Sequence, residues 1–481
     1  METSEIIVGL DIGTTKIAAI AGRLNDHGKV EILGVGRTDS VGVKRGVVSN
    51  IENTVQSIST AVKLASEQIG IEIDKVNVGI AGQHIRSQQT SQSIIRHNED
   101  EEISKEDIDR LLRDVQQLIV RPGENIIEVI PQEYTVDREQ GVKEPVGMLG
   151  TSLGANFHVI IGQTNAAKNI YKCVKKAQLT VTDLILEPIA SSEAVLSEEE
   201  KEAGVALVDI GGGTTDIAIF KEGIIRHTAV IPLGGDIVTE DVKEGCTIIK
   251  KHAEQLKIRF GSALAKMNSD NEVVAIPGLR GRPPKEITLK NLASIIQARM
   301  EEIIALIFSE IRGSGYEKKL IAGVVLTGGG AKLRHIRQLT EFLTGLDTRI
   351  GYPNEHLAVE SAEEYATPSY STGIGLVIEG LRRTSHSRIN TVENQKEINN
   401  TVERKQTVEV NINEKIDNIN KPEFSEKSDK SNPHTPLQPL EQTEVLNEET
   451  KKPNTDRNRT EPRTSNLFEM VKRFFEKDVD S

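Results

Sequence analysis

The stretch 205–220, VALVDIGGGTTDIAIF, constrains the fold of this chain more strongly than any other. Its two ends are short apolar runs rich in β-branched residues, which are typical of buried strands. Between them, three consecutive glycines can take backbone conformations that other residues avoid, so the stretch predicts two strands joined by a tight turn. The turn consists of Gly211, Gly212, Gly213, Thr214 and Thr215.

The same turn also predicts a chemical role. Because glycines lack a Cβ atom, the amide N–H groups of the turn can approach a phosphate closely, and the threonine hydroxyls add donors. Asp209 places a carboxylate beside the turn. Mg²⁺ that bridges phosphate oxygens through retained waters is the usual way to offset such a carboxylate. The turn therefore predicts a Mg-nucleotide site; the alternative is a structural hairpin that needs only flexible glycines.

A second copy of this arrangement lies near the start of the chain. The apolar run 6–10 leads into DIGTTK, from Asp11 to Lys16, and the apolar run 17–21 follows. Two near-identical turns at the starts of two halves predict paired hairpins that hold one phosphate chain from opposite sides. We therefore expect Asp11 and Asp209 to face each other across one crevice. Lys16 either contacts a phosphate as a point charge or is a solvated turn lysine.

Composition limits the classes of function. A length of 481 residues predicts two to four domains. The net charge of −13 argues against general nucleic-acid binding, which needs a basic surface. Cys173 and Cys246 are too few for a disulfide framework or a zinc site, which favours a reducing compartment. The acidic start and the lack of a long apolar stretch predict a cytoplasmic chain without signal peptide or membrane span.

Residues 85–162 differ in sequence pattern from the segments on either side and predict a small inserted subdomain. They contain a helix over 104–118, capped by Ser104, and several strand-like runs. We expect no catalytic cluster here, and interpret the histidines as structural or surface residues. These are His84, His97 and His158.

After the insertion, a helix over 166–177 and a strand over 181–186 lead into EPIAS, which begins a further helix at Glu187. The proline in this motif is well placed near a helix start. Glu187 either orients an attacking water beside the nucleotide crevice or is a first-turn carboxylate favoured by the helix dipole.

The second half contains further candidate motifs. The motif LGGD, residues 233–236, introduces a helical stretch that runs to about residue 248, and Glu254 and Lys257 share one face of the next helix. This pair either contacts a ribose or forms only a surface ion pair. A third glycine turn, TGGGA, follows a strand over 321–326 and opens onto a helix, which suits the base and sugar of a nucleotide. TGIGL then begins the last folded helix, at residue 372.

In chain order the motifs are DIGTT, EPIAS, DIGGGTTD, TGGGA and TGIGL. In this order the chain resembles the actin-like ATPase superfamily over about residues 6–383. The resemblance implies an α/β fold of two RNase H-like domains, with ATP and Mg²⁺ in the cleft between them. Asp11 and Asp209 would hold the metal and its water, and Glu187 and Asp209 would be catalytic. The remaining cofactor-binding residues would be Gly13, Thr14, Thr15, Lys16, Gly211, Gly212, Gly213, Thr214, Thr215, Gly235, Glu254, Lys257, Gly328, Gly329, Gly330 and Ala331.

Within that superfamily the chain is similar to the FtsA family of bacterial cell-division proteins. The similarity depends on the insertion between Gly82 and Gly162, on IPGLRGRPPKEIT followed by QARMEEI, and on the overall layout with its tail. It implies protofilaments, slow or absent ATP turnover, and a role in tethering the tubulin-like FtsZ to the inner membrane. The FtsZ C-terminal peptide would dock on the subdomain containing residues 280–312, where Arg299 and Glu302 are candidates.

The same resemblance implies the place of action and the domain limits. The protein would act at the cytoplasmic face of the inner membrane, at the division septum, where other division proteins are possible partners. Residues 1–84, 163–192 and 372–383 would form subdomain IA, 85–162 the inserted subdomain IC, 193–233 and 313–371 subdomain IIA, and 234–312 subdomain IIB.

The tail predicts a tether on grounds of its own. Residues 384–464 are rich in Asn, Glu, Lys, Thr and Pro and poor in large apolar residues, so we predict a disordered linker. As a random coil of roughly 80 residues it would span about 50 Å root-mean-square. The tail is longer than this family usually carries.

Residues 465–481 reverse this composition and predict an amphipathic membrane-targeting helix capped by Asn466. Lys472, Arg473 and Glu476 lie opposite the apolar face. With no neighbouring core to join, the helix is interpreted as an in-plane membrane anchor; the alternative is a peptide that docks on a partner or on its own globular part. The apolar face consists of Leu467, Phe468, Met470, Val471, Phe474 and Phe475.

Two other functions are known for this superfamily. A small-molecule kinase, for example of the sugar type, would need a substrate pocket and a base for the acceptor hydroxyl, and the sequence indicates neither. A chaperone-like ATPase would need a peptide-binding domain, for which the polar tail is a poor candidate.

Overall fold

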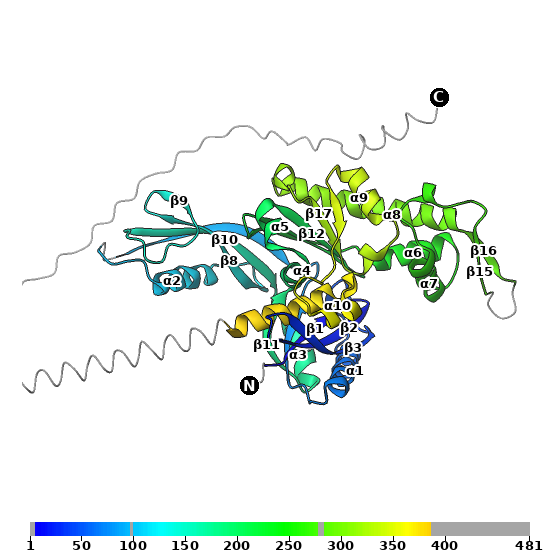
Figure 1. Cartoon of the computed structure of the whole chain (residues 1–481), viewed down its shortest axis with the longest axis horizontal. Helices are drawn as coiled ribbons and strands as arrows, with labels where there is room; N and C mark the ends of the chain where they lie inside the picture. The colour runs from blue at the N-terminus through cyan, green and yellow to red at the C-terminus, as the bar shows by residue number, and fades with distance from the viewer. Residues whose placement is uncertain (1–4, 97–99, 278–282, 386–481) are drawn as a thin grey trace, which may run out of the picture. The chain divides into compact units, whose positions relative to one another are not determined.

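The computed structural model describes residues 5–96, 100–277 and 283–385, and all of these belong to a single unit (Figure 1). His97, residues 278–282 of the IPGLRGRPPKEIT motif and the predicted linker beyond residue 385 lie outside the described residues. The predicted membrane helix and its apolar face lie outside them as well.

The first sheet contains the first glycine turn. Its first three strands form an antiparallel meander, and two later strands join it in parallel. The turn between the first two strands is therefore a true hairpin, as predicted. In spatial order the strands are β11 (Thr180–Leu186), β6 (Lys75–Ile80), β1 (Ile7–Ile12), β2 (Lys16–Leu24) and β3 (Val30–Asp39).

Helix α1 (Ile51–Ile69) packs on this sheet. Asn50 caps its start by accepting a bond from the Asn53 amide, and Gly70 ends it with a φ of +71°. Its contact with β3 is close because a Cβ at Gly36 would lie 1.8 Å from the Ala61 carbonyl. Helix α3 (Thr164–Lys176) packs beside α1.

The second sheet repeats the strand order and directions of the first. Three antiparallel strands are again followed by two that join in parallel. The second glycine turn occupies the same place in this sheet as the first turn does in its own. The strands are β14 (Ile224–Ile231), β13 (Thr215–Lys221), β12 (Val205–Ile210), β17 (Val324–Thr327) and β18 (Thr348–Ile350).

Helices α6 (Gly235–Gly245), α7 (Lys250–Phe260) and α8 (Leu289–Gly313) pack together after the second sheet's meander. The hairpin of β15 (Val273–Ile276) and β16 (Lys285–Thr288) lies next to α8. The smaller elements are β4 (Val43–Lys44), β5 (Val47–Val48), α5 (Glu198–Ala203), α9 (Ile336–Thr344), α10 (Val359–Tyr365), and the 3-10 turns η1 (Ala265–Met267), η3 (Glu317–Lys319), η4 (Gly329–Lys332) and η5 (Pro368–Tyr370).

The predicted insertion forms a sheet of its own with a separate core (Figure 1). Helix α2 (Lys105–Gln116) covers it and begins at a capping box between Ser104 and Asp107, which confirms the predicted cap. The polar stretch around residue 140 forms a strand that the sequence did not predict. The sheet order is β7 (Arg86–Ile95), β10 (Ser152–Gln163), β8 (Glu124–Val136) and β9 (Glu139–Val142).

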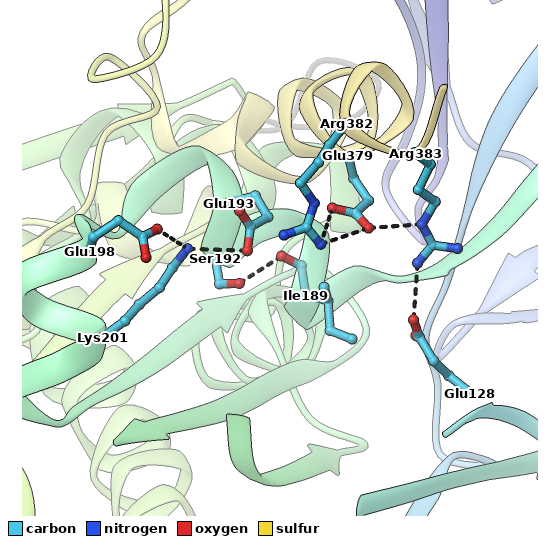
Figure 2. Close-up of polar contacts among 9 residues, drawn as sticks. All are labelled: Glu128, Ile189, Ser192, Glu193, Glu198, Lys201, Glu379, Arg382 and Arg383. Atoms are coloured by element: carbon cyan, nitrogen blue, oxygen red, sulfur yellow. Dashed lines mark hydrogen bonds and ion pairs between the residues drawn. The ribbon is translucent and has the colours of Figure 1, made fainter. Parts of the chain in front are cut away.

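Two helices connect the sheets. Helix α4 (Glu187–Val195) contacts strands of both large sheets, and residues 371–385 form a second helix. The two are in backbone contact, because a Cβ at Gly375 would lie 1.7 Å from the Ala190 carbonyl. At the end of the second helix, Arg383 pairs with Glu379 of its own helix and with Glu128 of β8 (Figure 2).

Candidate functional site

The two glycine turns, distant along the chain, meet in the structure. A Cβ at Gly212 would lie 1.8 Å from Thr15 Oγ1, and one at Gly213 would lie 2.6 Å from Thr14 Oγ1. Only residues without a side chain permit this approach, so the glycines of the second turn are explained by contact with the threonines of the first. The structure therefore brings together the two turns that the sequence singled out.

Four carboxylates lie at this junction and influence one another. Burial, and then the neighbouring charges of Asp11, Asp216 and Asp209, raise the pKa of Glu187 well above its ordinary value. The pKa of Asp209 is also raised, chiefly by burial and further by Asp11, while a hydrogen bond from Ser191 opposes the rise. Asp11 and Asp209 thus belong to one electrostatic cluster.

Asp216, the last residue of DIGGGTTD, is the fourth carboxylate and was not among the predicted site residues. It pairs with Asp209 across the β12–β13 ladder, and its Oδ2 accepts a hydrogen bond from Thr214 Oγ1 at 3.1 Å. Burial, and secondly the charge of Asp209, raise the pKa of Asp216 to about 8. The sequence signal for Asp216 is its position in the predicted hairpin, directly opposite Asp209, which is a predicted metal ligand.

Lys16 is not the solvated turn lysine that the sequence left open. Its Nζ lies 2.6 Å from Asp11 Oδ2 and 5.9 Å from the centre of the Tyr370 ring, and its side chain is only 16% exposed. The carboxylate it pairs with belongs to the same cluster, so Lys16 offsets part of the negative charge there. Contact with a phosphate stays a prediction.

The pair of Glu254 and Lys257 faces the start of α6. Lys257 Nζ lies 2.8 Å from Glu254 Oε2 and donates to the carbonyl of Gly235 at 2.8 Å. Thr239 bonds to both side chains. Lys257 is only 15% exposed, so these residues form a half-buried network that ties α7 to α6 and not only a surface ion pair.

The third glycine turn approaches Asp209 from another direction. Gly328 has a φ of +82°, and a Cβ there would lie 2.1 Å from Asp209 Oδ1. Only glycine satisfies both conditions. Gly329, Gly330 and Ala331 continue as a 3-10 turn before α9, so the predicted helix after this motif begins with a tighter turn than expected.

Metal binding at this cluster would depend on water. Among the residues that the structure describes, no group of three or more His, Cys, Asp or Glu side chains is placed to hold a metal ion. A Mg²⁺ ion near Asp11 and Asp209 would therefore keep most of its waters, which this ion readily does.

The predicted partner residues lie on α8, away from the motifs above in sequence. Arg299 forms a bidentate ion pair with Asp241 of α6, with Nε 2.5 Å from Oδ2 and Nη2 3.0 Å from Oδ1. It also pairs with Glu302. Arg299 is 24% exposed, whereas Glu302 is 53% exposed. The structure thus gives Arg299 an internal role that the sequence did not predict.

Comparison with known proteins identifies the family. A family model described as "Cell division protein FtsA" matches residues 206–375, and one described as "SHS2 domain inserted in FTSA" matches residues 82–161. The cell division protein FtsA of Pseudomonas aeruginosa is 43% identical over 385 residues, covering 80% of this chain and 91% of that protein. The chain belongs to the FtsA family. FtsA of Escherichia coli is 37% identical over 78% of this chain and 90% of its own length, and FtsA of Bacillus subtilis is 35% identical over 78% and 84%.

FtsA membership and the repeated sheet topology establish an actin-like ATPase fold and an actin-like cell-division protein. The solved structure of the PilM-PilN type IV pilus biogenesis complex has the same fold, with a TM-score of 0.56 at 15% identity over 78% of this chain and 98% of that chain. Neither a sugar-type kinase nor a chaperone-like ATPase is favoured by these findings. Among the described residues, no helix combines the length and apolarity needed to cross a bilayer.

Proposed function

We propose that this FtsA-family protein binds ATP with Mg²⁺ at the junction of its glycine turns, and that the bound nucleotide controls its assembly into protofilaments. The observation that supports this most directly is the contact of Thr14 and Thr15 with Gly213 and Gly212. This contact brings the hydrogen-bond donors of both turns, which suit phosphate oxygens, to one point.

The residues present fit such a ligand. The backbone amides of glycine turns suit phosphate oxygens, and a cluster of buried carboxylates with raised pKa values needs cationic charge. When bound, Mg²⁺ would supply that charge and bridge phosphate oxygens. Asp11 and Asp209 would hold its water shell, and Glu187 would orient the attacking water. Gly235, Glu254, Lys257 and 328–331 would bind the nucleoside.

Titration of the full chain with a fluorescent ATP analogue tests this proposal. We expect saturable binding that ATP competes away and that depends on MgCl2. Asp11→Asn and Asp209→Asn should each weaken Mg²⁺-dependent binding about tenfold or more, as expected for the loss of a charged hydrogen-bond partner. Binding that is identical in EDTA and in MgCl2 would refute the proposed role of these carboxylates. We expect turnover to be slow or absent.

The second part of the proposal is that the protein tethers the FtsZ ring to the cytoplasmic face of the membrane at the septum. Family membership and the apolar face predicted for residues 465–481 support it. Deletion of residues 467–481 should leave nucleotide binding intact and abolish co-sedimentation with liposomes. Retained sedimentation of the deleted protein would refute the anchor.

For the FtsZ contact, we propose that the C-terminal peptide of FtsZ docks near Arg299 and Glu302. Because Arg299 also anchors α6 through Asp241, replacing it would disturb packing as well as binding. Glu302→Ala is the cleaner test, since Glu302 is the more exposed of the two. Unchanged affinity for an FtsZ C-terminal peptide in this variant, measured by fluorescence anisotropy, would exclude Glu302 from the contact.

A further inference from the structure

Asp209 accepts hydrogen bonds from two hydroxyl groups that sequence reasoning did not select. Ser191 Oγ donates to Asp209 Oδ2 at 2.8 Å, and Thr372 Oγ1 donates to the same oxygen at 3.2 Å. The two hydroxyls lie 3.1 Å from each other. Ser191 has no exposed surface and Asp209 is 8% exposed, so water does not readily replace these bonds.

The two donors come from the two helices that connect the sheets. Ser191 belongs to α4, and Thr372 lies in the first turn of the helix over residues 371–385. The helices touch one residue before Ser191 and three residues after Thr372, at Ala190 and Gly375. Asp209 itself belongs to β12 of the second sheet. One oxygen of this carboxylate is therefore fixed relative to the helix crossing on which both sheets converge.

Within the described part of the chain, Asp209 Oδ1 accepts no such hydrogen bond, so this oxygen is the one available to a ligand. It lies close against Gly328, where an added Cβ would be only 2.1 Å away, so any side chain at residue 328 would collide with it. Because both hydroxyls bind Oδ2, rotation of the carboxylate would break two hydrogen bonds at once.

We infer that Ser191 and Thr372 are positioning residues that fix the orientation of Asp209 and so direct its Oδ1 to the water shell of a nucleotide-bound Mg²⁺. This inference rests on the proposed nucleotide site. It assigns a role to one hydroxyl from each connecting helix, so that the geometry of the helix crossing determines how well the metal is held.

The test is the MgCl2 dependence of binding of a fluorescent ATP analogue to the full chain. Thr372→Val keeps the side-chain shape and removes the donor, whereas Thr372→Ser restores it; Ser191→Ala removes the other donor independently. For Thr372→Val and Ser191→Ala we expect the MgCl2 midpoint to rise about 10- to 150-fold, the loss expected for a hydrogen bond to a charged group. Thr372→Ser should stay near the wild-type midpoint.

A matched control separates positioning from general destabilisation. Thr340 is 1% exposed and donates within α9 to the Ile336 carbonyl at 2.9 Å, so Thr340→Val removes a buried hydroxyl whose partner is its own helix and not Asp209. We expect Thr340→Val to lower the melting temperature without moving the MgCl2 midpoint. If Thr340→Val moves the midpoint as much as Thr372→Val, or if Thr372→Val and Ser191→Ala both keep the wild-type midpoint, the inference is overturned.

Nucleotide binding by the wild-type protein distinguishes failure of the proposed site from failure of the positioning role. Wild-type binding without MgCl2 dependence would refute the proposed site together with this inference. If wild-type binding depends on MgCl2 but the variants keep the wild-type MgCl2 midpoint, the proposed site is retained and only the positioning role is refuted.

Discussion

At the scale of single residues, His158 shows how burial makes a polar side chain sensitive to pH. It lies on β10 of the insertion, is 1% exposed, and contacts Gln89 Nε2 at 3.1 Å and Thr228 Oγ1 at 3.0 Å. The Gln89 amide also donates to the Arg226 carbonyl, so His158 Nδ1 must accept and its Nε2–H must donate. Burial, and secondly His227, lower the pKa of His158 to about 4.

This lowered pKa predicts a loss of stability in mild acid. Since the unfolded chain binds a proton near the ordinary pKa of 6.5 and the folded chain only near 4, stability is complete above 6.5 and falls as the pH drops between these values. We expect His158 to contribute a loss of about 2 kcal/mol between pH 8 and pH 5, measured by urea unfolding. His158→Gln should flatten the pH dependence by that amount. Equal pH dependence in both proteins would contradict the assignment.

Gly212 and Gly329 make a matched pair for testing the contact between the turns. A Cβ at Gly212 would lie 1.8 Å from Thr15 Oγ1, whereas one at Gly329 would meet nothing within 4 Å. Neither glycine has a positive φ, so steric overlap is the main difference between them. We expect Gly212→Ala to reduce the free energy of unfolding by about 1–3 kcal/mol and Gly329→Ala to change it by less than about 0.5 kcal/mol. Equal melting temperatures for the two variants would mean that the turns do not touch.

The residues of the site were predictable where the signal is local. Glycine, threonine and aspartate at fixed spacing identify a turn that can bind phosphate, and the structure brings both copies together. Ser191 and Thr372 were not singled out, although they lie in recognised motifs, because their common partner is fixed only by the crossing of two distant helices. The burial of Lys16 likewise depends on Tyr370, more than 300 residues away.

At the scale of elements, Arg383 joins the last described helix to the insertion (Figure 2). It lies 3.0 Å from Glu128 on β8 and 2.8 Å from Glu379, whose side chain is 2% exposed. Burial raises the pKa of Glu128 despite the nearby Arg383, with Glu379 adding to the rise. The arginine thus compensates two carboxylates that come from different elements.

Removing this arginine should therefore cost more than removing an exposed lysine. We expect Arg383→Met to reduce the free energy of unfolding by about 2 kcal/mol or more, because it removes the ion-pair partner of the largely buried Glu128, whereas Glu379 keeps its pair with Arg382. Lys63→Met, which breaks the exposed pair with Glu67, should change it by less than about 0.5 kcal/mol. In a double-mutant cycle with Glu128→Gln, we expect a coupling of about 1–3 kcal/mol. Strict additivity of the two changes would exclude a direct interaction.

Elements with a clear hydrophobic periodicity were predicted, whereas elements whose residues depend on neighbouring parts of the fold were not. Helix α2 and the strands beside the glycine turns follow from apolar spacing and caps. β14 was missed because Arg226, His227 and Thr228 interrupt its apolar pattern. The insertion contacts two of these polar side chains, because Glu133 pairs with Arg226 and His158 bonds to Thr228 Oγ1. Its residues Gln89, Gln132 and Ser87 also donate to backbone carbonyls of β14, the edge strand of its sheet. That environment exists only after folding.

At the scale of the whole molecule, the candidate site results from a repeated topology. Each large sheet contributes one hairpin turn at the same position in its strand order, and the connecting helices fix the sheets to each other. A site built this way depends on the angle between two sheets. The proposed nucleotide binding and the proposed assembly would therefore influence one another through that angle, since each would favour a particular approach of the two turns.

The predicted membrane helix adds a second coupled equilibrium. Partial burial of six apolar side chains, at up to about 1.5–3 kcal/mol each before ordering costs, gives only reversible attachment of one molecule. Linking many such helices in a filament would raise avidity strongly, so filament formation and membrane attachment should reinforce one another.

We expect co-sedimentation with liposomes to rise steeply with protein concentration under the conditions that favour assembly. Phe468→Glu with Phe474→Glu should abolish it at every concentration, whereas Lys472→Ala with Arg473→Ala should weaken it only modestly, because Glu469, Glu476 and Asp478 already limit attraction to anionic lipid. Retained sedimentation of the double glutamate variant would show that the apolar face is not what binds.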